Sequence, residues 1–157
     1  MSFRIAGLSP DPFQPLFGLS DAALAERGVL RKFADKRPGF PCRISLEDAA
    51  SGEAVLLLNY ESHSAPTPYR SAYAIYVREG VTTPACYEDE IPPVMRGRPL
   101  AFRHFDKEGM LVGASLALEG GARDAIQRAF ENAEVEYIHA HNAAHGCFAA
   151  QITRIAK

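Results

Sequence analysis

Alternation of apolar and polar residues recurs along the chain and predicts a protein built mainly from β-strands. The strongest pattern lies at 53–60, where the consecutive aliphatic residues Val55–Leu58 are typical of a strand covered on both faces. Residues 69–78 alternate and are rich in aromatic side chains, which favours a second central strand. Weaker or shorter patterns predict strands at 3–8, 42–46, 100–105, 110–118, 135–142 and 148–155.

Two pairs of these strands are predicted to form β-hairpins. The turn Asp106-Lys107-Glu108-Gly109 separates one pair, and Asn142 and Gly146 are expected to begin and close the turn of the last pair. Two segments between the strands, 62–68 with His63 and the proline-containing 81–99, are predicted as loops.

Two segments have the pattern of helices. Ser20 is expected to cap a short helix at 22–27 that ends at Gly28. A second helix is predicted at 123–133, with Ile126, Phe130 and Ala133 on one face. Most connections are too short for crossover helices, so the sequence predicts an α+β fold: one domain over 1–157, with a mainly antiparallel sheet of about seven strands and two short helices.

Composition excludes several classes of function. A formal net charge of −2 provides no positive field for nucleic acid. The longest aliphatic run, 54–58, is far too short to span a membrane, and the N-terminus lacks the pattern of a signal peptide. Three widely separated cysteines do not form a disulfide framework, so we expect a cytoplasmic protein with reduced thiols.

Histidine and cysteine gather in the segment His139-Ala140-His141-Asn142-Ala143-Ala144-His145-Gly146-Cys147. On a strand, His139 and His141 share one face about 6.5–7 Å apart. They are candidate catalytic residues and candidate ligands for a transition metal such as zinc, which needs at least one more ligand. The alternative is that both histidines pack at the sheet edge and hydrogen-bond to their neighbours. His145 is expected to be an exposed turn residue.

Cys147 is a candidate nucleophile, because a nearby imidazolium of the histidine cluster would lower the pKa of its thiol, and Cys42 is the alternative thiol. Arg43 and Arg70 each stand at the start of a predicted strand, and with Tyr69 and Asn142 they are candidates for binding a small anionic ligand. The alternatives are a small buried cysteine and ordinary ion pairs of the arginines with carboxylates.

Several motifs together identify a resemblance to a family. Pro41-Cys42-Arg43, Leu56-Leu57-Leu58-x-Tyr60, Pro68-Tyr69-Arg70, His139-x-His141-Asn142 and Gly146-Cys147 occur in the order found in the bacterial family catalogued as domain of unknown function 1203. The resemblance implies a small single-domain bacterial protein and no particular activity. The family pattern includes His139, His141, Asn142, Gly146 and Cys147, but no histidine at position 145.

Three functional hypotheses follow. The first is a small-molecule binding protein or enzyme, in which His139, His141 and Cys147 line one pocket with Arg43, Tyr69 and Arg70. The second is a non-enzymatic interaction module, such as a homodimer through a sheet edge. The third is a redox sensor, which requires two cysteines within disulfide reach.

Overall fold

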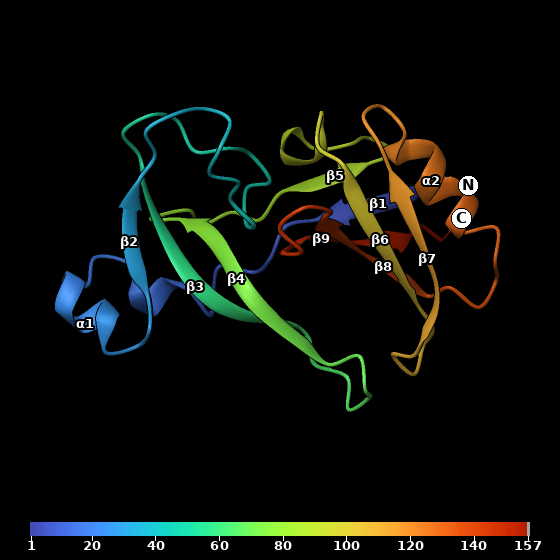
Figure 1. The fold of residues 1–157 in the computed structure, drawn as a ribbon, viewed down its shortest axis with the longest axis horizontal. Coiled ribbons are helices and arrows are strands. Elements are labelled where there is room, and N and C mark those ends of the chain that lie inside the picture. Colours follow the sequence, from blue (N-terminus) through green and yellow to red (C-terminus); the bar gives the residue numbers. More distant parts are fainter. Residues whose placement is uncertain (157) are drawn as a thin grey trace.

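The structure, a computed structural model that describes residues 1–156, has nine strands in two antiparallel sheets and two α-helices within that range (Figure 1). The α+β prediction is confirmed, with two strands more than the seven expected. The smaller sheet has the order β2-β3-β4, with β2 at Leu30–Phe33, β3 at Ala54–His63 and β4 at Ser71–Arg78. The larger sheet has the order β5-β1-β9-β8-β6-β7.

The strands of the two predicted hairpins, β6–β7 and β8–β9, begin and end within two residues of the predicted bounds. The strands of the larger sheet are β1 at Phe3–Ala6, β5 at Cys86–Glu88, β6 at Leu100–Phe105, β7 at Leu111–Ala117, β8 at Tyr137–Asn142 and β9 at Phe148–Arg154. The helices are α1 at Asp21–Ala25 and α2 at Ala122–Ala129, and single 3-10 turns lie at Gln14–Leu16 and Pro93–Met95.

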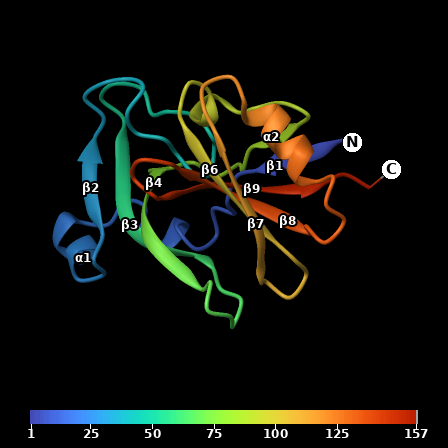
Figure 2. The same ribbon diagram turned by 45° about the vertical axis from the view of Figure 1, so that its right-hand side comes forward.

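One face of the larger sheet forms the main core with α2. Ile126 and Phe130 pack against strand residues such as Phe102 and Ile138, all of which are fully buried. Burial of these large apolar side chains stabilises the fold by about 1.5–3 kcal/mol for each side chain. In both Figure 1 and Figure 2, helix α2 lies against the larger sheet, on the side away from the smaller sheet.

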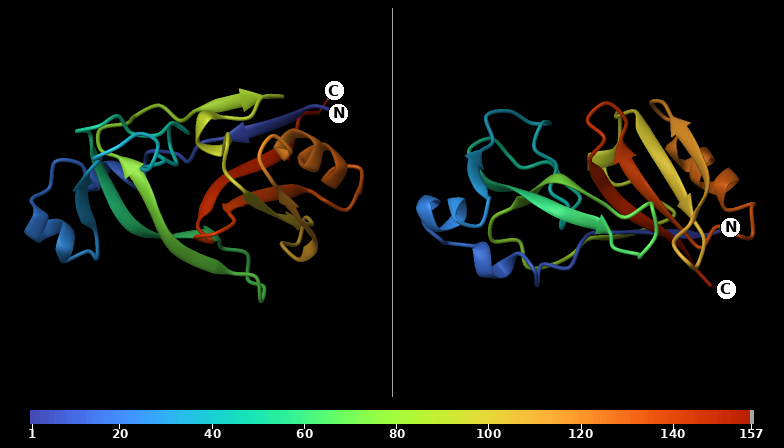
Figure 3. Two further views of the ribbon diagram at one scale, coloured as in Figure 1. Left: turned by 45° about the horizontal axis from the view of Figure 1, so that its top comes forward. Right: turned by 60° about the horizontal axis from the view of Figure 1, so that its bottom comes forward.

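The opposite face of the larger sheet is turned toward β3 and β4, as the two views of Figure 3 also show. The His63 ring at the end of β3 stacks on Phe105 of β6, with 4.0 Å between ring centroids. Tyr60 of β3 meets Phe148 of β9 at 6.1 Å. This layer of rings joins the two sheets, because it buries apolar surface from both.

The smaller sheet has its own core with the N-terminal segment. Leu56 and Ile75 pack there against Phe13 and Leu24. The predicted cap of α1 is present, since the Ser20 hydroxyl accepts a hydrogen bond from the Ala23 N–H at 3.1 Å.

Three predictions for individual segments are wrong, and one further strand was not predicted. Residues 42–46 form a turn instead of a strand, because the Leu46 N–H bonds to the Cys42 carbonyl and Leu46 has a positive φ of 54°. His63 ends β3 instead of lying in a loop, and β5 interrupts the predicted 81–99 loop. Strand β2 was not predicted, because its exposed residues show no alternation. Among the described residues, no helix has the length and apolarity needed to cross a membrane.

Candidate functional site

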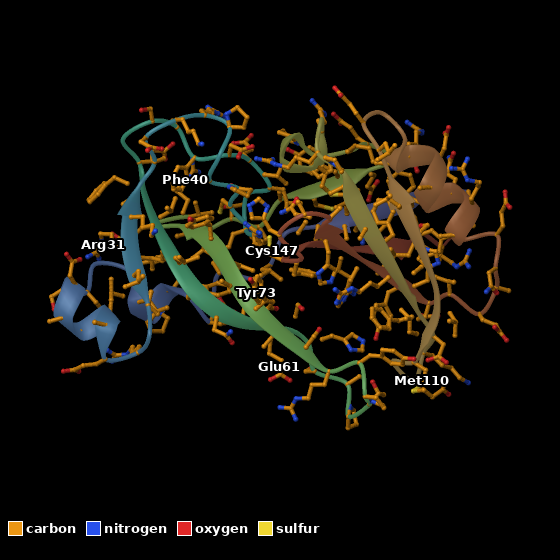
Figure 4. The ribbon with its side chains drawn as sticks, in the orientation of Figure 1. Arg31, Phe40, Glu61, Tyr73, Met110 and Cys147 are labelled. Atoms are coloured by element: carbon orange, nitrogen blue, oxygen red, sulfur yellow. The ribbon has the colours of Figure 1, made fainter. Side chains whose placement is uncertain are left out.

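Cys147 lies in the turn between β8 and β9, near the boundary between the two sheets (Figure 4). The turn has the predicted geometry: the Gly146 N–H donates to the Asn142 carbonyl, and Gly146 has a φ of +79°. A positive φ favours glycine over residues with a side chain. The turn therefore places Asn142 beside Cys147, where the Asn142 Nδ2 donates to Sγ at 3.3 Å.

Arg43 reaches the same sulfur atom from the other side. Its Nη2 donates to Sγ of Cys147 at 3.2 Å, its Nε to the Phe148 carbonyl at 2.8 Å and its Nη1 to the Pro41 carbonyl at 2.6 Å. The residue is only 3% exposed. Burial lowers the pKa of Arg43, and the Cys147 sulfur opposes this effect. Among residues 1–156, no carboxylate forms an ion pair with this guanidinium.

Arg43, Asn142 and Cys147 line a cavity of about 780 Å³, here called the Cys147 pocket. Its volume falls in the range of small-molecule sites. Lys36, Arg98 and His145 also line the pocket, and no Asp or Glu is among its described lining residues. Arg98 is neutralised by Asp48 through two hydrogen bonds of 2.8 and 3.1 Å, whereas Arg43 has no such partner in the described chain.

His139 and His141 lie between the sheets and not on the wall of this pocket. Both rings contact the Phe148 ring, at centroid distances of 5.0 and 6.0 Å. The Nε2 of His139 is bonded to Gln151 at 3.2 Å, and Nδ1 of His141 is bonded to the Gly146 carbonyl at 2.8 Å. The Nδ1 of His139 is buried and has no hydrogen-bond partner among the described residues.

Burial holds both histidines in the neutral form. The pKa of each is lowered from 6.5 to about 4, mainly because the buried environment disfavours the charged ring. Hydrogen bonds to the side-chain oxygen of Gln151 and to the Gly146 carbonyl oppose the shift, and the charge of Arg103 adds to it at both rings. A base with so low a pKa accepts a proton poorly near pH 7.

The structure does not assemble the predicted metal site from the described residues. No group of three or more His, Cys, Asp or Glu side chains within 1–156 is placed to hold a metal ion. The His63 ring lies 5.4 Å from the His139 ring, but its two nitrogens are bonded to the Tyr69 carbonyl and the Tyr137 hydroxyl. The nitrogen that bound zinc would have to give up its present hydrogen bond.

Tyr69 and Arg70 lie apart from the Cys147 pocket. They line a different cavity, of about 650 Å³, together with Arg103. Arg70 pairs there with Glu61, whose oxygen lies 2.7 Å from Nε. Of the seven predicted site residues, the structure thus brings together Arg43, Asn142 and Cys147, and separates them from His139, His141, Tyr69 and Arg70.

Sequence reasoning missed four charged or ionisable residues at these cavities. Lys36, Arg98 and Arg103 are single basic residues with no motif to mark them, and His145 was expected only to decorate the turn. Proximity of Lys36 to the glycine and prolines of the 36–41 loop was the one available signal, because loops that are rich in these residues often line sites.

The three cysteines are free and lie in different environments: Cys42 is buried, Cys86 is exposed and Cys147 is intermediate.

The searches of curated proteins and of solved structures returned no match to this chain. The family described as protein of unknown function (DUF1203) matches residues 39–154, which include every residue that lines the Cys147 pocket except Lys36 and Pro38. The chain therefore belongs to the DUF1203 family.

Proposed function

We propose that the Cys147 pocket binds a small anionic ligand and that the sulfur of Cys147 acts on it as a nucleophile. The observation that carries the proposal is the buried guanidinium of Arg43, whose described hydrogen-bond acceptors are two carbonyls and the Cys147 sulfur. A buried charge is costly without a counter-charge. A thiolate at Cys147, or an anionic ligand beside it, supplies one.

The arrangement favours a reactive sulfur. The guanidinium of Arg43 and the amide N–H of Asn142 both donate to Sγ, and hydrogen bonds to the charged form of a group stabilise that form. In the proposed reaction, the sulfur electron pair forms a bond to an electrophilic atom of the ligand. The leaving group departs with its own bonding pair.

The remaining walls indicate the chemistry of the ligand. Lys36 and Arg43 bring positive charge to a pocket without described carboxylates on its walls, which favours an anion. Tyr73 and Leu57 of the smaller sheet add apolar surface for the body of the ligand. With three free cysteines in the described chain, a reducing compartment such as the bacterial cytoplasm is the proposed location.

Two alkylating reagents that differ in charge test the proposal. In a Cys86→Ser variant, Cys147 is the remaining accessible thiol, because Cys42 is fully buried. The measured quantity is the rate of alkylation by iodoacetate divided by the rate by iodoacetamide. We expect this ratio to be about five- to tenfold higher in the folded protein than in the same protein unfolded in urea, which corresponds to about 1 kcal/mol of attraction. Inorganic phosphate is expected to slow both reagents by occupying the pocket.

Matched variants separate the pocket from general surface charge. Lys36→Gln removes a cation from the pocket rim and should reduce the preference for iodoacetate, whereas Lys32→Gln on β2 should not. An unreactive Cys147, or an iodoacetate preference equal to that of the unfolded chain, would contradict the proposed function.

A second proposed role is homodimer formation through the edge of the smaller sheet. Leu30 and Phe33, at the two ends of the edge strand β2, are 54% and 65% exposed, and an edge strand has unpaired backbone groups that can pair with another copy. Sedimentation equilibrium of the native chain and of Phe33→Glu tests this role. We expect the native chain to be a dimer and Phe33→Glu to be a monomer. A native chain that is monomeric at about 10⁻⁴ M would contradict this role.

A further inference from the structure

A second cavity lies on the face of the larger sheet that is turned toward β3 and β4. It lies between residues 68–71 and strands β6 and β7, and its volume is about 650 Å³. The loop between β3 and β4 is tied to the β6–β7 turn, because the Thr67 hydroxyl donates to the Gly109 carbonyl at 3.1 Å. Figure 1 shows these two connections side by side at the lower end of the molecule.

One guanidinium in this cavity has no counter-charge. Arg103 is half-buried on β6, opposite His139 of β8, and within residues 1–156 its side chain forms neither an ion pair nor a hydrogen bond. Arg70, the other cation of the cavity, is paired with Glu61. His139 and His141, on the neighbouring strand, are neutral near pH 7 and supply no negative charge. Among the described lining residues, Arg103 therefore provides the unpaired positive charge that can attract a bound anion.

The remaining walls of the cavity are mainly apolar. Phe105 and Tyr69 place their rings in an edge-to-face arrangement, with centroids 6.4 Å apart. Leu111 and Leu116 of β7 line the same cavity, and the Leu116 side chain is 62% exposed at its rim. Exposed leucine beside such rings indicates a surface that a ligand with an apolar body would cover.

We propose that this second cavity, the Arg103 cavity, binds a carboxylate that carries an aromatic ring. The planar guanidinium of Arg103 matches a carboxylate in two parallel hydrogen bonds. The ring of the ligand packs against Tyr69, Leu111 and Leu116, where contact with the Tyr69 ring adds to the burial of apolar surface. The site shares no lining residue with the Cys147 pocket, so it goes beyond the proposed function and does not depend on it.

Calorimetric titration with 2-naphthoate tests the site directly. The native protein is expected to bind one naphthoate, and Arg103→Gln should weaken binding at least tenfold. The neutral analogue 2-naphthamide should bind the native protein at least tenfold more weakly than naphthoate, and equally to both proteins. Arg123→Gln on α2 is the matched control, because it removes an exposed arginine on the opposite side of the larger sheet and should leave naphthoate binding unchanged.

Carboxymethylation of Cys147 separates this site from the Cys147 pocket. If naphthoate binds at Arg103, the modified protein binds it as well as the native protein. Loss of binding on modification would place naphthoate in the Cys147 pocket and overturn the inference. Undetectable binding at millimolar naphthoate, or equal affinity in native protein and a folded Arg103→Gln, would also overturn it. Circular dichroism checks the fold of each variant, and Arg103→Lys, which keeps the charge, should retain part of the affinity.

Discussion

The guanidinium of Arg43 lies 3.2 Å from the sulfur of Cys147 and joins two segments that are 104 residues apart in the chain. The same guanidinium bonds to the carbonyl of Phe148, the first residue of β9. Arg43 therefore links the turn at 42–46 to the larger sheet and at the same time contacts the candidate nucleophile. We therefore expect replacement of this one side chain to change both the stability of the protein and the reactivity of the thiol.

Replacement of Arg43 should destabilise the protein. In Arg43→Gln, buried carbonyls of Pro41 and Phe148 lose their donors, and an unsatisfied buried group costs about 1–3 kcal/mol. We expect the free energy of unfolding, measured by urea denaturation, to fall by about 2–4 kcal/mol. Arg4→Gln is the control, since it removes an exposed pair with Glu88 and should leave the midpoint nearly unchanged. Equal midpoints for the two variants would contradict the structural role of Arg43.

Stability should decrease in acid because of the two buried histidines. The folded pKa of His139 and of His141 is about 4, below the usual 6.5, so the unfolded chain binds protons between these values that the folded chain does not. The free energy of unfolding therefore falls as the pH falls from about 6.5 toward 4, by about 3 kcal/mol for each histidine. His139→Gln should flatten this dependence in urea titrations at several pH values. A slope as steep in His139→Gln as in the native chain would contradict the neutral, buried state of this ring.

The three thiols should react in a fixed order with a colorimetric disulfide reagent. Cys86 is exposed and Cys147 is intermediate, whereas Cys42 is fully buried and accepts the Arg78 N–H at its sulfur. We expect two thiols to titrate in the native protein and the third only after unfolding. Cys86→Ser and Cys147→Ser should each leave one native-state thiol. Rapid reaction of three thiols in the native protein would show that the 42–46 turn opens readily.

Gly7 should tolerate no side chain. A Cβ atom at this position would lie 1.9 Å from the Ile44 carbonyl oxygen, and the next residue, Leu8, donates its N–H to the Arg43 carbonyl. Gly7→Ala should lower the free energy of unfolding by about 3 kcal/mol, at the upper end of the range for overpacking. It should also slow alkylation of Cys147, because the segment that holds Arg43 must move.

Gly52→Ala is the comparison for that variant. Gly52 has a φ of +90° and no atom near its missing Cβ, so only backbone strain of about 1–2 kcal/mol is expected. A Gly7→Ala variant as stable as Gly52→Ala would show that the contact with Ile44 relaxes easily.

Local pattern identified most of the strands, because alternation is a property of neighbouring residues. The run Val55–Leu58 marked β3, and the two C-terminal hairpins were found with bounds close to those observed. The pattern failed where long-range pairing decides the structure. Strand β5 is three residues long and forms because it pairs with β1. Strand β2 likewise forms by pairing with β3.

The sequence by itself determined that β8 carries His139 and His141 on one face and that Asn142 and Gly146 begin and close the turn before Cys147, because both follow from the geometry of a single hairpin. Only the tertiary structure decided which distant residues share a cavity. It placed Arg43 on the Cys147 sulfur, Arg70 and Tyr69 with Arg103, and the two histidines in the layer between the sheets. The packing of one sheet on the other determines which of these distant residues are neighbours, and no local pattern in the chain encodes that packing.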